Sequence, residues 1–128
     1  MGLLECILHE TTFLYHSKLS GISTYMYKLC VYIPLSHVEQ VKKAIFEAGG
    51  GKIGNYDNCC WQTHGQGQFR PLADSNPYIG QPGEIETIEE VKIELVVDEA
   101  LIKQVIARLK QAHPYEEPAY DVWLLANI

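Results

Sequence analysis

The chain has 128 residues, a mass of 14.5 kDa and a formal net charge of −6, which is enough for one domain with a real core. The acidic balance argues against a nucleic-acid binder, since such proteins usually carry a basic surface. No stretch approaches the roughly 20 consecutive apolar residues of a membrane span, and the N-terminus lacks a secretory signal pattern. We therefore expect a cytoplasmic protein with neither nucleic-acid nor membrane partners.

Residues 1–25 differ from the rest, because they combine many apolar residues with little charge and lack a clear helix cap. Two interpretations fit this segment. It is either an upstream extension that results from start-site choice, which we favour, or a short added helix that covers an edge or an interface. Residues 26–128 are expected to form one domain.

Alternating apolar residues predict a strand over 26–34. Ser36 and Glu39 have the S-x-x-E spacing of a capping box, so a helix should follow and end at the glycines 49–51. Turn-forming residues dominate 52–86, where we expect an irregular hairpin of short strands, with a bulge or bend at Gly65-x-Gly67.

The second half repeats the strand-helix pattern. Val91, Ile93, Leu95 and Val97 mark a half-buried strand, and Asp98 is a plausible N-cap for the helix that follows. This helix should end before Pro114, and residues 119–125 should form the last strand. The apolar face of this second helix is formed by Leu101, Ile102, Val105, Ile106 and Leu109.

The order β-α-β-β-α-β predicts an α+β fold of the ferredoxin-like type, with two helices on one face of an antiparallel sheet. The other face would carry Tyr32, Trp61 or Trp123 and would stay open. An exposed aromatic face of this kind predicts a homo-oligomer.

The four cysteines form no CxxC motif, so we expect reduced thiols and no disulfide framework. Cys30 lies in an apolar run and should be a small buried side chain. Cys59 and Cys60 are adjacent and would point to opposite faces of a strand, which makes them a poor chelate. Cys6 lies in the N-terminal segment.

The string HPYEEP at 113–118 is the most distinctive motif of the chain. Its simplest interpretation is a turn from the second helix into the last strand, in which two prolines set the backbone and the histidine caps the helix. The alternative is a site in which His113 and Glu116 or Glu117 bind a metal or an anion.

A second, looser cluster contains Asp57, Cys59, Cys60 and His64. It has the ligand types of a mixed metal site but not the spacing of a structural zinc site. A thiol beside His64 would also be a nucleophile-base pair. Arg70 follows Gly65-x-Gly67 and could hold an anionic ligand.

Four segments resemble the YqfO-type insert domain of the Nif-three-like family, whose members are often called GTP cyclohydrolase 1 type 2 homologues. They are GKIGNYD at 51–57, GQGQFRP at 65–71, NPYIG at 76–80 and AHPYEEPAYD at 112–121. The resemblance covers 26–128 and leaves out residues 1–25.

This resemblance implies a lid domain that stands alone. Full-length members hold a two-metal site of His, Asp and Glu in a larger flanking domain, which is absent from this sequence, so those ligands and the hydrolase label are not transferred. The insert domain is similar to CutA and PII-type signalling proteins, which are ferredoxin-like and trimeric. The HPYE string is also similar to a motif of CutA, a family linked to divalent copper.

We therefore expect a non-catalytic, trimeric binding or regulatory module that binds a metal ion or a small anionic ligand. The candidate metal ligands, for a divalent transition metal, are His64 and His113. One alternative is a small metal- or thiol-dependent hydrolase that uses these histidines with Cys59 or Cys60. The other is a partner subunit that docks as a lid on a separate metal-binding domain. The candidate ligand-binding residues are Tyr56, Gly65, Gly67, Arg70, Tyr115, Glu116 and Glu117.

Overall fold

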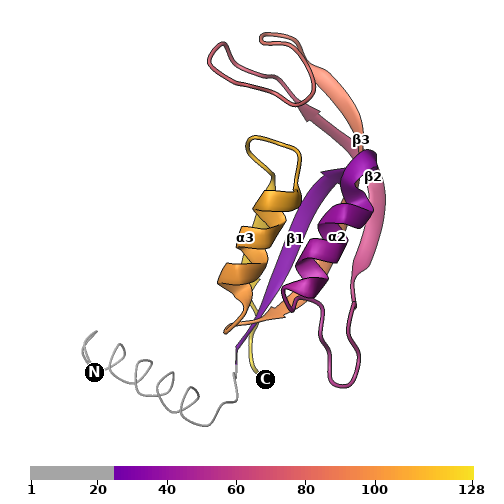
Figure 1. Ribbon diagram of the computed structural model, residues 1–128, viewed down its shortest axis with the longest axis vertical. Coiled ribbons are helices and arrows are strands. Elements are labelled where there is room, and N and C mark those ends of the chain that lie inside the picture. The colour runs from indigo at the N-terminus through magenta and orange to yellow at the C-terminus, as the bar shows by residue number, and fades with distance from the viewer. Residues whose placement is uncertain (1–24) are drawn as a thin grey trace, which may run out of the picture.

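The structure is a computed structural model that describes residues 25–128 (Figure 1). The expectations about residues 1–25 and Cys6 therefore lie almost entirely outside the described residues. The elements follow the expected order along the chain. They are β1 (Met26–Pro34), the 3₁₀ helix η1 (Leu35–His37), α2 (Val38–Glu47), β2 (Trp61–Phe69), β3 (Glu86–Asp98), α3 (Ile102–Ala112) and β4 (Tyr120–Leu124).

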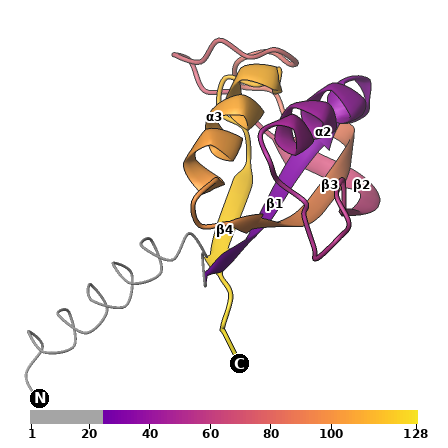
Figure 2. The same cartoon turned by 60° about the horizontal axis from the view of Figure 1, so that its bottom comes forward.

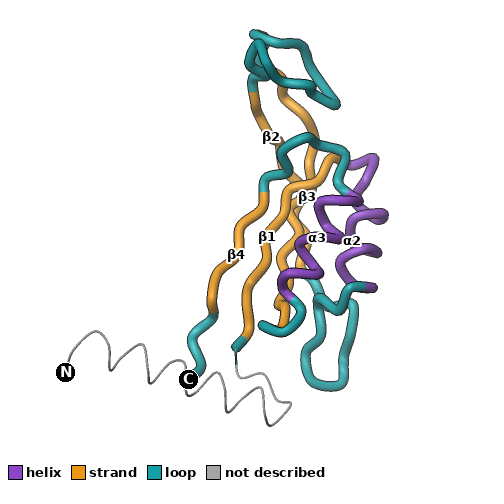
Figure 3. The backbone as a smooth tube through the Cα atoms, turned by 60° about the vertical axis from the view of Figure 1, so that its left-hand side comes forward, coloured by secondary structure: helices purple, strands orange, loops and turns teal. Residues whose placement is uncertain are grey.

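The four strands form one antiparallel sheet in the order β2-β3-β1-β4. Figures 2 and 3 show α2 and α3 side by side on one face of this sheet, while none of the helices formed by residues 25–128 covers the other face. This arrangement is the split β-α-β pattern of a ferredoxin-like sandwich, so the predicted fold class is confirmed. None of the helices formed by residues 25–128 is long and apolar enough to cross a membrane.

The core lies between the two helices and the inner face of the sheet. The alternation of apolar and polar residues in β1 and β3 turns one side of each strand toward the helices. The predicted apolar faces of both helices pack against them, with Val105 and Leu109 at 0% exposure. The core side chains are Leu29, Val31, Ile33, Val38, Val41, Ile45, Ala48, Val91, Ile93, Leu95, Val97, Val105 and Leu109.

Two predicted helix starts differ from the structure. Ser36 does not form the capping box with Glu39, because it lies in η1, where its Oγ is 2.7 Å from Nδ1 of His37. The helix proper starts later, at Val38. Asp98 does accept a hydrogen bond from the Ala100 N–H at 2.8 Å, but this bond closes a turn, and α3 begins after it.

The hairpin of β2 and β3 is longer and more regular than the sequence predicts. Its strands have 9 and 13 residues, whereas short irregular strands were expected. Gly65 and Gly67 sit in continuous register opposite Glu90 and Ile88, so neither forms a bulge. Backbone pairing with the strongly patterned β3 overrides the turn propensity of β2. The irregular part is the loop over 70–85, which projects beyond the helices in Figure 1.

Within residues 25–128, the face of the sheet opposite the helices is open, as predicted. Register places Trp61 beside Glu94 and Cys30, and Trp123 beside Lys28, all on this face. Trp61 is 69% exposed and Trp123 is 51% exposed. The strands at the two sheet edges are β2 and β4.

Candidate ligand-binding site

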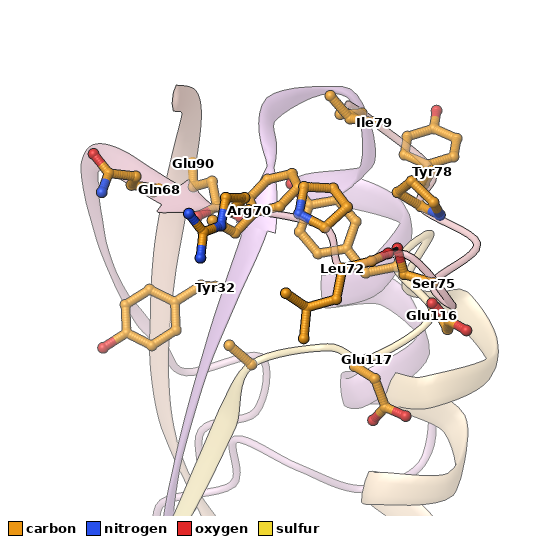
Figure 4. A pocket seen from close by; sticks show the side chains of 16 residues that line it. Tyr32, Gln68, Arg70, Leu72, Ser75, Tyr78, Ile79, Glu90, Glu116 and Glu117 are labelled. Carbon is orange, nitrogen blue, oxygen red and sulfur yellow. Dashed lines mark hydrogen bonds between the residues drawn. The ribbon is translucent and has the colours of Figure 1, made fainter. Parts of the chain in front are cut away.

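A pocket of about 420 Å³ lies at one end of the sheet, where the 70–85 loop folds back over the strands. Its walls come from the ends of β1, β2 and β3, from this loop and from the turn over 113–119 (Figure 4). We call this space the loop pocket. It combines segments that are far apart in the sequence, so only the folded chain forms it.

Aromatic rings form much of the wall. Tyr115 is at the centre of this cluster, with ring centroids 6.0 Å from Phe69, 6.4 Å from Tyr78 and 4.8 Å from His113. These separations are within the range of favourable tilted and edge contacts. Tyr32, at the end of β1, adds a fourth lining ring to those of Phe69, Tyr78 and Tyr115.

His113 holds the turn in place. Its Nε2 lies 2.7 Å from the carbonyl oxygen of Tyr32, and its Nδ1 accepts the N–H of Tyr115 at 3.1 Å. A carbonyl oxygen can only accept, so Nε2 carries a proton. Because Nδ1 accepts a hydrogen bond, it carries none, and the ring is neutral. Burial lowers the pKa of His113, partly opposed by the bond to Tyr32. Both ring nitrogens are used in this way, which favours the turn interpretation of the HPYEEP motif.

The 70–85 loop is tied to the turn and to itself. Glu116 Oε2 accepts the backbone N–H of Asn76 at 3.1 Å. Within the loop, Ser75 Oγ donates to the carbonyl of Leu72 at 2.6 Å, and the N–H of Gly83 donates to the carbonyl of Pro71 at 2.7 Å. These bonds hold the loop in the position that closes the pocket.

Glu90, Gly67 and Tyr115 meet at one side of the pocket. The Glu90 carboxylate occupies the space into which a side chain at Gly67 would project, since a Cβ there would lie 2.7 Å from Glu90 Cδ. Burial raises the pKa of Glu90, and the neighbouring Tyr115 partly opposes this shift. Burial and the Glu90 charge both raise the pKa of Tyr115. The buried Tyr115 hydroxyl still has no partner of hydrogen-bond geometry among residues 25–128.

Carboxylates outnumber cations around the loop pocket. Arg70 is its one lining cation in the described chain, against Glu90, Glu116 and Glu117. No ion pair found within residues 25–128 includes Arg70. The pocket therefore has an unpaired guanidinium, a half-buried carboxylate and two exposed carboxylates.

The structure brings together five of the nine predicted site residues, namely Gly67, Arg70, Tyr115, Glu116 and Glu117. Two others, His64 and Gly65, line a neighbouring cavity of about 260 Å³.

Two predicted site residues lie elsewhere. Tyr56 is 75% exposed in the loop between α2 and β2, at the opposite end of the sheet from the 70–85 loop (Figure 1). His113 lies behind the pocket wall, where it orients Tyr115.

The predicted metal and thiol clusters do not assemble. Within residues 25–128, no group of three or more His, Cys, Asp and Glu side chains is placed to hold a metal ion. Cys30 is fully buried, as expected, and burial raises the pKa of its thiol. Cys59 Sγ donates to the carbonyl of Asp57 at 3.5 Å, and Cys60 packs against the core. All three thiols are free, and neither Cys59 nor Cys60 has a hydrogen bond to His64 in this part of the chain.

Sequence reasoning missed Tyr32, Phe69, Tyr78 and Glu90 as lining residues. Glu90 belongs to a run of glutamates that looks like a solvated surface. Its role depends on the register that sets it beside Gly65 and diagonally across from Gly67. An aromatic residue near each glycine-rich or proline-rich segment was the available signal for the three rings.

Comparison with known proteins gives a partial-length match. No family model matches the chain. The GTP cyclohydrolase 1 type 2 homolog of Halalkalibacterium halodurans is 47% identical over 102 residues, which are 80% of this chain and 27% of that protein. The chain thus spans about a quarter of the length of the curated relatives it matches.

Solved structures give the same picture. A Bacillus cereus protein related to NIF3 is 41% identical with a TM-score of 0.70, and the match covers 82% of this chain and 27% of that one. The PII-like protein CutA from Nostoc sp. PCC 7120 is 19% identical with a TM-score of 0.57, over 79% and 82% of the two chains. This second likeness concerns the fold alone. The fold is thus similar to that of CutA and PII-like proteins. The resemblance to the Nif-three-like family is confirmed, and this chain matches a segment that makes up about one quarter of its GTP cyclohydrolase 1 type 2 homologues.

Proposed function

We propose that this chain is a non-catalytic binding module and that its ligand is a small molecule held in the loop pocket. The main observation behind this proposal is that three motifs far apart in the sequence line one cavity, which has aromatic walls and a few polar groups. These motifs are GQGQFRP at 65–71, NPYIG at 76–80 and AHPYEEPAYD at 112–121. A cavity of about 420 Å³ is within the usual size range of small-molecule sites. The exposed Arg70 guanidinium supports it, because it forms no ion pair among residues 25–128 and is available to a ligand.

The metal hypothesis and the hydrolase hypothesis have less support. His113 uses both ring nitrogens for backbone contacts, and His64 lines a different cavity. A thiol-dependent reaction would need Cys59 or Cys60 in contact with a base. We therefore favour binding over catalysis.

Self-association is part of the proposal. Trp61 and Trp123 lie on the open face of the sheet with more than half of their surface exposed. An exposed aromatic surface of this kind is typical of an interface. We propose a homo-oligomer that covers this face, with a trimer as the expected form.

A lid function is the second candidate. It is supported by the fact that the chain corresponds to about a quarter of its curated relatives. Leu72 and Tyr78 of the 70–85 loop are 68% and 52% exposed, so this loop offers apolar surface to a separate metal-binding domain. Co-purification of the two proteins, compared between the wild type and Leu72→Ser, would test it. If the wild type and Leu72→Ser form the complex equally well, docking through this loop is contradicted.

Native mass spectrometry of the protein, purified without a metal-affinity tag, tests the main proposal. We expect a trimer with an adduct of constant mass on each chain. Ala119→Trp should remove the adduct, because Ala119 lines the loop pocket and a bulky side chain would fill it. Ala107→Trp, on the exposed side of α3, is the matched control and should keep it. Adduct-free protein, or an adduct that survives Ala119→Trp, would contradict binding in this pocket.

A further inference from the structure

We propose that the loop pocket selects an organic cation with an apolar or aromatic body, in preference to an anion. This inference rests on the proposed ligand-binding function and adds the chemical class of the ligand. It departs from the small anionic ligand expected from the sequence. Three features of the pocket support it: the excess of carboxylates in its lining, the half-buried carboxylate of Glu90 and its aromatic rings.

The charge of the lining favours a cation. Glu90, Glu116 and Glu117 contribute three carboxylates, whereas Arg70 contributes one positive charge. Figure 4 shows Arg70 and Glu90 on one side of the cavity and Glu116 and Glu117 on the other, so an occupant would lie between Glu90 with its neighbour Arg70 and two further carboxylates. A concave surface with one predominant sign of charge attracts ligands of the opposite sign.

Glu90 supplies the specific contact. Its carboxylate is half-buried beside Tyr115, and burial raises its pKa although the Tyr115 hydroxyl partly opposes this shift. Two cations lie in the surrounding segments, and neither forms an ion pair with it. Arg70 has no ion pair among the described residues, and Lys92 pairs with Glu94 at 3.5 Å. A bound ammonium group would compensate the Glu90 charge through a charge-assisted hydrogen bond.

The aromatic walls fit the same ligand. The faces of Tyr and Phe rings attract cations, most strongly where water is excluded. Phe69, Tyr78 and Tyr115 form a continuous cluster at centroid separations of 6.0 and 6.4 Å. Such a wall would receive the apolar body of an amine and contribute to binding of its charged head.

Three aromatic probes of similar size separate the possible charges of the ligand: benzylammonium, benzyl alcohol and benzoate. Calorimetric titration of the full chain should give saturable binding of benzylammonium, at least about fivefold tighter than benzyl alcohol, with benzoate weakest. Glu90→Gln should weaken benzylammonium binding about fivefold or more. Arg70→Gln should leave that binding unchanged or strengthen it, because a repelling charge is removed.

Glu89→Gln is the matched control for the change in net charge. Glu89 is the neighbour of Glu90 on β3 but lies on the other side of the strand, where it accepts a bond from Gln66 at 3.1 Å. The Glu89→Gln variant should bind benzylammonium with the same affinity as the wild type. Equal weakening by Glu89→Gln and Glu90→Gln would overturn a specific role for Glu90 and with it the inference.

The other outcomes separate the inference from the proposed function. If benzoate binds most tightly and Arg70→Gln abolishes its binding, the pocket binds ligands but is an anion site, and only the inference fails. If folded protein binds none of the three probes at millimolar concentration, the ligand-binding function fails together with the inference.

Discussion

Gly67 and Gly65 form a matched pair for testing the arrangement around Glu90. Both are on β2, both face the open side of the sheet, and they are two residues apart. A Cβ at Gly65 would meet no atom within 4 Å. A Cβ at Gly67 would lie 2.7 Å from Cδ and 3.4 Å from Cγ of Glu90, so the Glu90 carboxylate must move.

The difference in stability between the two alanine variants isolates this contact. Alanine in a strand gains about 0.5–1 kcal/mol over glycine, and this gain is common to both sites. Overpacking costs about 1–3 kcal/mol, and the low end applies here because the displaced group is the end of a flexible side chain. We therefore expect Gly67→Ala to be about 1 kcal/mol less stable than Gly65→Ala, which itself should match or exceed the wild type.

Urea unfolding followed by tryptophan fluorescence measures this difference. The same pair of substitutions made in a Glu90→Ala background provides the control, because removal of the carboxylate should abolish the difference between them. Equal stability of Gly67→Ala and Gly65→Ala with Glu90 present would refute the argument. A difference that persists without the carboxylate would show that another contact causes it.

Three further predictions concern other parts of the molecule. His113 has a lowered pKa in the folded state, so the unfolded chain binds more protons and the free energy of unfolding should fall as the pH drops below 6.5. Denaturation curves from pH 7.5 down to 5 measure this change. The prediction is contradicted if the free energy of unfolding does not fall over that interval, or if His113→Asn shows the same fall as the wild type. Tyr115→Phe should change stability by no more than about 1 kcal/mol, since the buried hydroxyl has no hydrogen bond of good geometry and the substitution removes only its interaction with the Glu90 carboxylate. A larger loss in thermal unfolding would mean that the hydroxyl has a strong bond. Trp61→Glu and Trp123→Glu should shift the chain toward monomers in sedimentation velocity, and an unchanged oligomer would exclude the open face as the interface.

The parts of the fold with strong periodicity were predictable from the sequence. Strand β1 appears with the expected bounds, and Leu95 and Val105 are core residues as their spacing indicated. The strand β2 was not predictable in the same way, because its glutamines, glycines and Thr63 give no apolar alternation. Pairing along β3 determines this strand, and such pairing is a property of the folded sheet.

The residues of the candidate site were also predictable only in part. Motifs that lie in loops, such as the HPYEEP turn with Tyr115, pointed to real lining residues. Tyr56 belongs to a motif that is equally distinctive, but it lies in the loop between α2 and β2, which is at the opposite end of the sheet from the 70–85 loop (Figure 1). Glu90 was overlooked because the side of the strand that it faces depends on register. Residue type alone therefore pointed to the polar residues of the turn as pocket-lining residues. The position of the Glu90 carboxylate beside Gly67 could be found only from the three-dimensional structure.

The edge position of β2 has a consequence for the behaviour of the protein in solution. Nine residues of this strand pair with β3 on one side, and no strand of the described chain pairs with the other side. The strand contains no Lys, Arg, Asp, Glu or Pro, the residues that usually prevent a further strand from adding to an exposed edge. Its free N–H and C=O groups are thus a template for sheet extension. Concentrated protein should therefore aggregate through this edge unless another chain covers it.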